Sequence, residues 1–359
     1  MSGAPAIDVV LVNYRGWEAL VKTVHHLRGS SSRSVAGWPH GLIRVVDNSE
    51  DAEQARCLDR ALGSMADVTL QVMPRNMGFA AGCNAAWACS TATYVMLLNP
   101  DAMITADGVM GLAMALEDRT AAAAASPRTW WDRPGGWALP SPTPQGPTAR
   151  VWRAIGSRRN PSGWADAQVR QTLRQMARTE PFAVEMLAGA LLMLRRTAVE
   201  AAGGLFDPAF FMYFEDAELC TRLRAAGLEL LMVPQVDAVH AWQQLPHKAA
   251  LMASGEAVFL QRQNAAYRLI RHLWPGIESM GCLPGEPSVL AEPGDAARVL
   301  GEVSAISPAP SGDPAVVRWG PPQVISPGEW ALLEPGRYWA RTSRGWVGFD
   351  KRLGGLSPS

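Results

Sequence analysis

Short apolar segments alternate with helical patterns along the first hundred residues. Residues 7–12, 42–46, 68–72 and 94–98 are short runs rich in apolar residues, each closed by polar or turn-forming residues, which is typical of strands; the run 94–98 is expected to be buried. A helix is expected after the first run, because its apolar residues recur at helical spacing: Trp17, Leu20, Val21, Val24 and Leu27. Strands that alternate with helices predict an α/β fold with a parallel, twisted sheet.

Polar side chains stand where these strands end. Asn13 follows the first strand, Asp47 the second, and Asn99 and Asp101 follow Tyr94–Leu98. The carboxyl ends of parallel strands share one edge of the sheet, where ligands bind, so we expect these four residues to face one pocket. A carboxylate there can hold Mg²⁺ or Mn²⁺, and through the metal a diphosphate. Asn99-Pro100-Asp101 taken alone also fits a plain turn.

The turn after the first strand argues against two common nucleotide sites. Residues 13–16 read Asn-Tyr-Arg-Gly, where a dinucleotide-binding protein would carry G-x-G-x-x-G. The chain also contains no G-x-x-x-x-G-K-[ST] motif. A bound metal is therefore the expected way of handling phosphates.

An acidic pair follows an aromatic run in the second half of the chain. The run Met186–Leu194 predicts a buried strand, and Gly189 within it suggests close approach by a ligand or another backbone. Further on, Glu215 and Asp216 begin a predicted helix. Acidic residues at a helix N-terminus complement the helix dipole, and the pair alone needs no other explanation.

The middle of the chain holds a loop-like segment and a basic one. Residues 127–147 are rich in Pro and Gly and contain three tryptophans, which predicts an irregular loop rather than a packed element. The segment Arg150–Arg178 carries seven arginines and one acid, Asp166. Its helical pattern indicates either a solvated surface helix or, as a sharper hypothesis, a helix in peripheral contact with an anionic membrane or with the diphosphate of a lipid-linked acceptor.

Composition narrows the class of protein. Lys+Arg and Asp+Glu both number 33 among 359 residues, so net charge gives no bias toward nucleic acid. No basic region precedes an apolar run at the N-terminus, so no signal peptide is expected. The five cysteines form no C-x-x-C pair and are expected to be buried thiols in a reducing compartment. We therefore expect a cytoplasmic protein, with the membrane's inner face as the peripheral alternative.

The last segment differs in composition from the rest. Residues 281–359 are rich in Pro and Gly, with short apolar alternations at 315–319, 330–333 and 338–341. This pattern predicts a small β-rich C-terminal region rather than a helical one. Carbohydrate binding, self-association into a homo-oligomer and simple covering of the preceding domain all remain open as its role.

Four motifs, in their order, resemble one enzyme family. VVLVNY, VVDNSE, RNMGFAAGCN and LLNPDA together are similar to family 2 glycosyltransferases of the GT-A fold, particularly the rhamnosyltransferase-like branch. The resemblance covers residues 1–276 and implies a nucleotide-diphospho-sugar transferase fold there, a mostly parallel twisted sheet flanked by helices. It further implies transfer of rhamnose from a dTDP-rhamnose donor to a glycan acceptor, lipid-linked in some relatives, in surface polysaccharide synthesis.

The resemblance also suggests roles for single residues on the donor side. In such enzymes the carboxylate after the second strand reads the nucleotide base, and the turn after the first strand packs around base and ribose. The N-x-G-F-A segment then lies along the donor, close to the metal turn. Carried over to this sequence, the donor-binding residues are Asn13, Tyr14, Asp47, Asn76, Gly78, Asn84 and Asn99.

The metal and catalytic roles follow from the same resemblance. Many relatives carry Asp-x-Asp where this chain has Asn99-Pro100-Asp101, which leaves Asp101 as the metal carboxylate and His240 as a further candidate ligand. The segment GGLFDPAFFMYFEDAELCTRLRAAG matches the acceptor-side motif, so Asp216 is the expected general base and Glu215 is expected to orient the acceptor. One base opposite the leaving group implies a single displacement with inversion.

Two other functions remain as alternatives. A nucleotidyltransferase would share the nucleotide-binding half of the sheet and the metal, but it needs a glycine- and basic-rich loop after the first strand, which residues 13–16 lack. A degenerate sugar-binding or assembly protein would keep the fold without the chemistry. The presence of Asp47, Asp101 and Asp216 together argues against such a protein.

Overall fold

A computed structural model shows how these segments fold. It describes residues 6–29, 38, 40–240, 248–262, 265–273, 275–276, 279–283, 287–309, 311 and 314–352. The first elements along the chain are β1 (Ile7–Asn13), α1 (Trp17–Gly29), β2 (Ile43–Asp47), α2 (Ala52–Leu62), β3 (Val68–Val72), α3 (Phe79–Cys89), β4 (Tyr94–Leu98), β5 (Ala102–Ile104), α4 (Ala106–Asp118) and β6 (Ala122–Trp130). Within the described part of the chain, no helix is long and apolar enough to cross a membrane.

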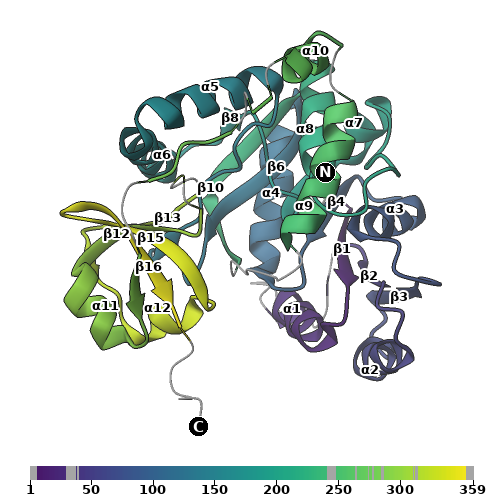
Figure 1. Ribbon diagram of the computed structural model, residues 1–359. Coiled ribbons are helices and arrows are strands. Elements are labelled where there is room, and N and C mark those ends of the chain that lie inside the picture. The colour runs from purple at the N-terminus through teal and green to yellow at the C-terminus, as the bar shows by residue number, and fades with distance from the viewer. Residues whose placement is uncertain are drawn as a thin grey trace.

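The later elements form the second half of the body and a C-terminal region. Those of the body are β7 (Trp137–Ala138), α5 (Pro147–Arg159), α6 (Pro161–Met176), β8 (Phe182–Val184), β9 (Leu191–Arg195), α7 (Arg196–Ala201), α8 (Glu215–Ala225), β10 (Glu229–His240), α9 (Lys248–Gln261) and α10 (Ala265–Leu273). The C-terminal region holds β11 (Ser288–Leu290), α11 (Pro293–Leu300), β12 (Glu302–Ser307), β13 (Val316–Arg318), β14 (Gln323–Val324), α12 (Pro327–Leu332), β15 (Gly336–Thr342) and β16 (Gly345–Lys351), drawn in light green to yellow in Figure 1.

A parallel half-sheet with helices on both faces forms the body. Strands β3, β2, β1 and β4 lie side by side in that order and run parallel. Every residue of β1 is buried: Val9 and Leu11 belong to a core with α1, α2 and α4, whereas Val10 and Val12 belong to a second core with α3 and α8. Burial on both faces explains the nearly continuous apolar run. The expected α/β fold is confirmed.

The sheet continues through strands of mixed direction. β9 lies antiparallel between β4 and β6, and β10 runs parallel to β6. The far end of β10 pairs antiparallel with β5, which places His240 opposite Ala102. This pairing brings His240 beside the turn that follows β4, from a position far along the chain.

The predicted strand Met186–Leu194 is wrong in its first half. The strand β9 begins at Leu191, and residues 186–190 form a turn instead. The backbone N–H of Gly189 in this turn donates a hydrogen bond to Asp216 Oδ2 (3.0 Å), and the carbonyl of Ala190 accepts one from Asn99 N–H (2.9 Å). Because these backbone groups bond to neighbouring turns, they are not available to pair with an adjacent strand.

The segment 127–147 was predicted to be an unpacked loop, and this prediction is also wrong. Its first part extends β6 to Trp130, and Trp137–Ala138 form β7, which pairs with both β6 and β13. The side chains of Trp130, Trp131 and Trp137 are buried. The C-terminal region supplies the partner strand of β7 and most of the apolar residues that cover Trp131 and Trp137. The sequence of the segment alone gives no sign of these distant partners.

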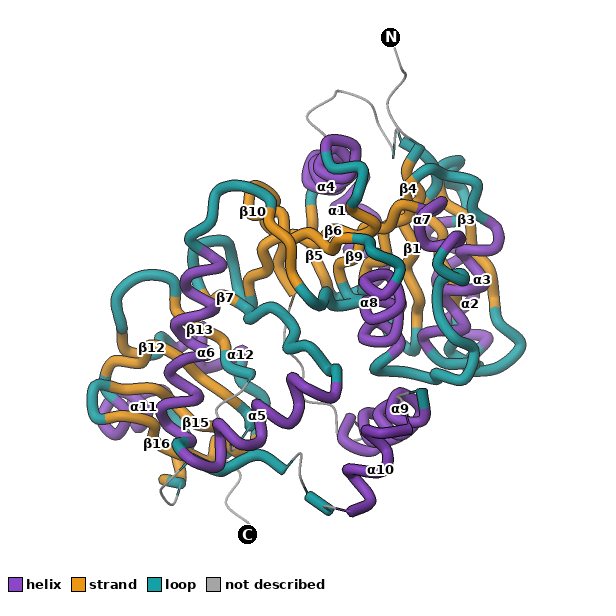
Figure 2. Tube along the Cα trace, turned by 90° about the horizontal axis from the view of Figure 1, so that it is seen from above, coloured by secondary structure: helices purple, strands orange, loops and turns teal. Residues whose placement is uncertain are grey.

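The C-terminal region contains helices as well as strands. The stretch 330–333, predicted as a strand, lies mostly in the helix α12. A capping box between Ser326 and Glu329, together with Pro327 in the first turn, favours the helix. In the tube view of Figure 2 the region lies beside α5 and α6.

The apolar side of α6 is covered by protein. Val169 and Leu173 pack against a cluster that includes Trp339 and Trp346 of the C-terminal region, and Met176 is buried. Arg150, on α5, is buried and paired with Glu256. The apolar residues of α6 therefore hold the C-terminal region, and peripheral membrane contact through the arginines of Arg150–Arg178 stays a prediction.

A buried ion pair fixes the C-terminal region to β7. Glu329 Oε1 accepts hydrogen bonds from Arg318 Nη1 (2.9 Å) and from the indole N–H of Trp137 (2.9 Å), and the Arg318 guanidinium lies over the Trp137 ring. Burial raises the pKa of Glu329, but the hydrogen bonds from Arg318 and from Ser326 outweigh it and lower the pKa to about 2. The carboxylate is therefore ionised throughout the physiological range.

We expect Glu329→Gln to lower the free energy of unfolding by about 3–5 kcal/mol, because it leaves the Arg318 charge buried without a counter-charge. The stabilisation from a carboxyl of lowered pKa is present above its ordinary pKa of 4.5 and is lost as the pH falls toward about 2. Urea unfolding across this pH range measures both effects. Asp350→Asn breaks the exposed Arg337–Asp350 pair and is the matched control, expected to cost about 1 kcal/mol or less; equal losses for the two variants would contradict the assignment.

Candidate active site

The ends of β1 and β2 meet in a closed polar cluster. Asn13 Nδ2 donates to Asp47 Oδ1 (2.9 Å) and Ser49 Oγ (3.0 Å), and Ser49 Oγ donates to the same Asp47 oxygen (2.6 Å). Asn13 and Asp47 lie opposite each other in the sheet register and are buried. Tyr14 next to them is 56% exposed. The cluster thus presents an aromatic ring at its surface and a fixed carboxylate beneath it.

A second network joins the donor side to the acceptor side. Asn48 Nδ2 donates to Asn76 Oδ1 (3.1 Å) and to the carbonyl of Gly78 (3.0 Å), while Asn48 Oδ1 accepts from Met77 N–H (2.9 Å). Gly78 has φ +85°, and a Cβ there would lie 2.2 Å from the carbonyl oxygen of Phe211. This position needs glycine, because the close approach seats the aromatic run before α8 against the donor segment.

Asn84, a predicted donor-binding residue, bonds through its side chain to the backbone of Phe206. Its Nδ2 donates to the carbonyl of Phe206 (2.9 Å), and its Oδ1 accepts from the N–H of the same residue (3.1 Å). Both polar atoms of the side chain are therefore engaged by the turn that leads to Phe210–Phe214. The geometry gives Asn84 a positioning role in this turn.

The turn after β4 is held from three sides. Thr23 Oγ1 donates to the carbonyl of Pro100 (2.6 Å), Asn99 N–H donates to Ala190, and Ala102 N–H donates to the carbonyl of Asn99 (3.0 Å). These bonds leave the Asp101 carboxylate, which is about one third exposed, facing His240, whose Nε2 lies 3.4 Å from Asp101 Oδ1. The sequence-predicted metal residues are thus adjacent.

The Asp101–His240 pair fits a divalent metal with an open coordination sphere. Among the described residues, no third His, Cys, Asp or Glu joins the pair in a group that could hold an ion. A carboxylate and an imidazole leave the remaining coordination positions to water or to oxygens of a substrate. This ligand set suits Mn²⁺ better than Mg²⁺, because Mg²⁺ prefers oxygen ligands to an imidazole nitrogen. Asn99, Asp101 and His240 all line one cavity, so a ligand can reach the open positions.

Asp216 stands at the border of the same cavity. Its Oδ2 accepts from Gly189 N–H (3.0 Å) and its Oδ1 from Ala217 N–H (2.8 Å), and the neighbours of Gly189, Ala188 and Ala190, line the cavity. Burial raises the pKa of Asp216 above the ordinary carboxyl range, and the two backbone hydrogen bonds oppose this rise. A carboxylate with a raised pKa is a stronger proton acceptor than an exposed one.

Glu215 is the more deeply buried member of the pair. Its side chain is 5% exposed, and among the described residues Oε2 finds no hydrogen-bond partner. Burial and the nearby Asp216 charge raise the pKa of Glu215 to about 8. At neutral pH Glu215 is therefore mostly protonated, which relieves the repulsion between the two carboxyl groups. Tyr213, whose phenol pKa is raised by burial and by the charges of Glu215 and Asp101, lies near both acidic sites.

We expect Glu215→Gln to change the pH dependence of stability more than the activity at neutral pH. A carboxyl whose folded pKa is raised lowers stability as the pH rises from its ordinary value of 4.5 to about 8, because the folded protein keeps a proton that the unfolded chain releases. The amide imitates the protonated form, so the variant should lose this decline. Unfolding free energies measured from pH 4 to 9 test the change; an unaltered profile would contradict the assignment.

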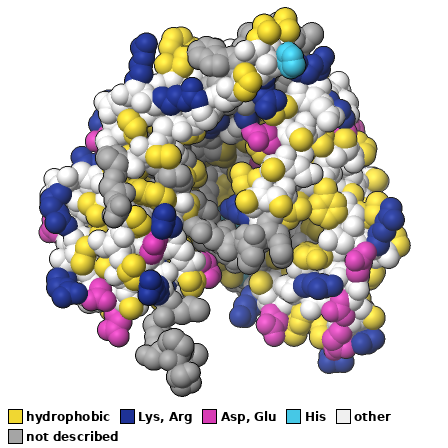
Figure 3. All heavy atoms as spheres, viewed as in Figure 1, with side chains coloured by type: hydrophobic (Ala, Val, Ile, Leu, Met, Phe, Trp, Pro, Cys, Tyr) yellow, Lys and Arg dark blue, Asp and Glu magenta, His cyan; other side chains and the backbone are white. Residues whose placement is uncertain are grey.

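The cavity is large and mostly apolar. Its volume is about 400 Å³, and it lies between the turn after β4, β10, α6 and Pro314 of the C-terminal region. The space-filling view shows a hollow between the C-terminal region and the side of the molecule that carries α9 (Figure 3). Asn13 and Asp47 share the sheet edge but do not line this cavity, because they are buried in their own cluster. The sequence predicted that all four strand-end residues face one pocket. This prediction is wrong, because only Asn99 and Asp101 line the cavity.

Sequence reasoning missed several residues of the site. Asn48 stands inside the VVDNSE motif, next to Asp47, and its place at a strand end was an available signal. Tyr213 lies in the aromatic run and was noted only as part of it. Thr172 and Gln175 line the cavity from α6, and the sequence carries no signal for them.

The family model for "Glycosyl transferase family 2" matches residues 8–200, which is more than half of the chain. An N-acetylglucosaminyl-diphospho-decaprenol L-rhamnosyltransferase of Mycobacterium tuberculosis is 38% identical over 82 residues, 23% of this chain and 24% of the relative. The rhamnosyltransferase WbbL of Escherichia coli is 40% identical over 57 residues, 16% of this chain and 21% of the relative. The matched parts thus span about a quarter or less of these two relatives.

Longer matches exist at lower identity. The low-salt glycan biosynthesis hexosyltransferase Agl10 of Haloferax volcanii is 26% identical over 238 residues, 65% of this chain and 66% of the relative. A structure of GalNAc-T7 with UDP, GalNAc and Mn²⁺ aligns with a TM-score of 0.56 and 15% identity, over 80% of this chain and 53% of its own. The mannosyltransferase PcManGT of Pyrobaculum calidifontis, in complex with GDP-Man and Mn²⁺, aligns with a TM-score of 0.50 and 16% identity, over 77% and 70%. These structures show the shared fold.

Proposed function

Because this chain belongs to glycosyl transferase family 2, we propose that it transfers a sugar from a nucleotide-diphospho-sugar donor to a hydroxyl group of a glycan acceptor, with inversion. The observation that carries the proposal is the placing of Asp216 beside the cavity that Asp101 and His240 line. Asp101 and His240 line the cavity, and Asp216 is bonded to Gly189, whose neighbours Ala188 and Ala190 line it. Such an arrangement suits attack by a hydroxyl on one side and departure of a diphosphate on the other.

Asp216 would receive the proton of the acceptor hydroxyl. A hydroxyl is a poor nucleophile, and a carboxylate within hydrogen-bond reach can take its proton as the bond to the sugar forms. The two backbone N–H groups hold the Asp216 oxygens in place, so the carboxylate is oriented before the acceptor binds. Protonated Glu215 behind it removes the repulsion that a second charge would cause.

Asp101 and His240 would hold Mn²⁺ or Mg²⁺ next to the donor diphosphate. A metal bound there supplies positive charge that stabilises the negative charge on a departing diphosphate. Tyr14, which is exposed beside the Asn13–Asp47 cluster, would stack on the nucleotide base. Asn48 and Asn76 keep the segment around Gly78 in the shape that such a donor would contact.

The donor and acceptor are proposed from the relatives. Two of them are rhamnosyltransferases, which supports dTDP-rhamnose as the donor. The name of the Mycobacterium tuberculosis relative contains N-acetylglucosaminyl-diphospho-decaprenol, which supports a lipid-linked acceptor in synthesis of a surface glycan.

A panel of nucleotide sugars tests the proposal. The purified chain is mixed with MnCl₂ or MgCl₂ and each donor, and the unfolding midpoint and slow donor hydrolysis are recorded. The expected result is a shift with one donor, dTDP-rhamnose, that EDTA abolishes. A shift with another nucleotide sugar would keep the enzyme class and change the donor, whereas no shift and no hydrolysis with any donor would contradict the proposal.

A further inference from the structure

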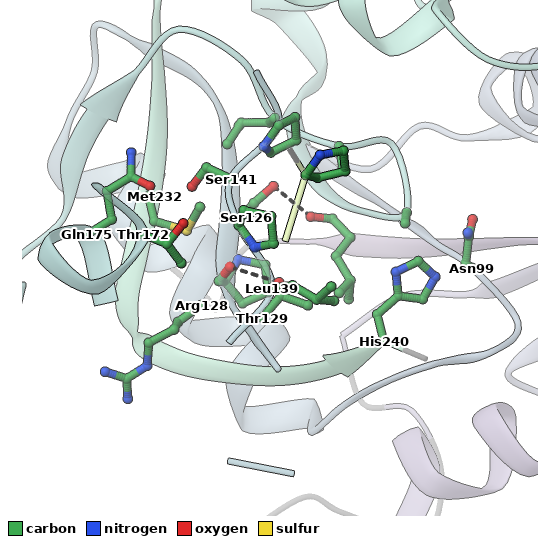
Figure 4. A pocket seen from close by; sticks show the side chains of 18 of the residues that line it. Asn99, Ser126, Arg128, Thr129, Leu139, Ser141, Thr172, Gln175, Met232 and His240 are labelled. Carbon is green, nitrogen blue, oxygen red and sulfur yellow. Dashed lines mark hydrogen bonds between the residues drawn. The ribbon is translucent and has the colours of Figure 1, made fainter. Parts of the chain in front are cut away.

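The cavity extends well beyond the Asp101–His240 pair. Figure 4 shows Asn99 and His240 on one side of it and Ser141, Thr172 and Gln175 on the other. Thr172 and Gln175 belong to α6, and Ser141 follows β7, so this far side is built by the middle segment. None of the sequence motifs around the donor and metal residues reaches it.

The polar side chains of the far side are available to a ligand. Within the residues that the structure describes, the side chains of Ser141, Thr172 and Gln175 make no hydrogen bond to protein. By contrast, other polar side chains of the lining are engaged: Ser126 Oγ donates to the carbonyl of Leu191, and Arg128 pairs with Asp237. Polar groups in a recessed site gain from a partner that replaces water, so the far side can bind hydroxyl or amide groups.

The rest of the far side is apolar. Leu139, Met176, Met232 and Pro314 line it together with neighbouring prolines. A ligand that fills this space must therefore offer polar groups to one wall and carbon to another. A sugar with a methyl substituent meets both demands, whereas a fully hydroxylated sugar would bury hydroxyl groups against the apolar wall without hydrogen bonds.

The C-terminal region shapes this part of the cavity. It contributes Pro314 directly, and its strand β13 pairs with β7, just before the lining segment 139–142. The buried contact of Glu329 with Trp137 fixes the same strand. The C-terminal region and the lining segment 139–142 are therefore packed together as one unit.

We propose that the far side of the cavity is a subsite for the acceptor sugar, that it takes a sugar unit bearing a methyl group, either 6-deoxy or N-acetyl, and that the C-terminal region sets its shape. The proposal rests on the proposed function, since the acceptor hydroxyl has to reach Asp216. Its ligand contacts are Ser141, Thr172 and Gln175 for the polar groups and Met176 and Pro314 for the methyl-bearing face.

Ligand-observed NMR with soluble glycosides tests the subsite without needing turnover. The probes are two pairs of octyl glycosides, N-acetylglucosamine with glucose and L-rhamnose with L-mannose, added to the full chain in MnCl₂. The methyl-bearing member of at least one pair should bind about fourfold more tightly than its partner, which is the value of one buried methyl group. Thr172→Val and Gln175→Leu should each weaken that binding by about tenfold.

Two further variants keep the test sharp. Arg174→Gln changes an exposed residue of the same helix that does not line the cavity and should leave binding unchanged. Pro314→Trp changes an exposed residue, narrows the cavity from the C-terminal side and should abolish binding while the unfolding midpoint is kept. If no glycoside binds the wild type, or if the three cavity variants bind like it, the proposal is overturned.

The donor-induced shift of the unfolding midpoint separates this inference from the function. A donor shift without glycoside binding would overturn the acceptor subsite alone. Glycoside binding that depends on Gln175, without a response to any donor, would support the sugar subsite and contradict the transferase function.

Discussion

Replacing Asp216 by Asn should lower the turnover number by about 10³-fold, within the range lost when a positioned general base is removed. The side chain lies at the border of the cavity, and its oxygens are fixed by Gly189 and Ala217. Asparagine keeps the size of the group but cannot accept the proton of an acceptor hydroxyl. Initial rates at saturating donor and acceptor measure the effect.

The same experiment has a binding control and a matched variant. Donor binding, followed by the shift in unfolding midpoint, should stay close to that of the wild type, because the proposed role of Asp216 is on the acceptor and not on the donor. Glu185→Gln removes an exposed carboxylate near the same turn and should leave turnover unchanged. In the wild type the rate should rise with pH through an apparent pKa above the ordinary carboxyl range, since the base must be ionised. Turnover that survives in Asp216→Asn would overturn the base assignment.

Replacing Asp101 by Ala should lower turnover by at least about 100-fold, because metal stabilisation of a leaving group contributes several kcal/mol. The carboxylate is the one anionic member of the Asp101–His240 pair. Without it, the imidazole alone would hold a divalent ion weakly. Donor affinity in MnCl₂ should therefore fall to the value that the wild type shows in EDTA.

A titration with and without metal distinguishes this role from a structural one. In EDTA the wild type and Asp101→Ala should bind donor equally, and the difference should appear only as Mn²⁺ is added. Asp118→Ala, a change of an exposed carboxylate at the end of α4, should behave like the wild type throughout. Wild-type activity that persists in EDTA would rule out the metal role of the pair.

The sequence by itself determined the parallel half of the fold. The strand β4 has the predicted bounds, β1 extends the predicted strand by one residue, and α1 begins at Trp17 and buries the predicted apolar face. These segments are predictable because burial on both sheet faces forces a continuous apolar run, and a one-sided helix forces a periodic one. The sequence also placed Asp101 at a strand end, and the edge rule for parallel sheets then pointed to a ligand site.

The tertiary structure decided where distant residues meet. The pairing of β5 with β10 brings His240 to Asp101, and the turn before β9 brings Gly189 to Asp216. Local pattern does not show such partners, because backbone pairing and side-chain contact depend on segments far apart in the chain. The resemblance suggested roles for His240 and Asp216, and those roles stay predictions until the variants are measured.

The segment 127–147 and the C-terminal region show the same limit most clearly. Both are rich in Pro and Gly, and 127–147 was predicted to be a loop, yet its strand β7 pairs with β13 of the C-terminal region and buries Trp137 against Glu329 and Arg318. Composition reports how a segment behaves in water, whereas these two bury their apolar surface against each other. The sequence thus determined the parallel half of the fold. The wall opposite the Asp101–His240 pair exists only because tertiary packing joins β7 to β13, a pairing that neither segment's own pattern predicts.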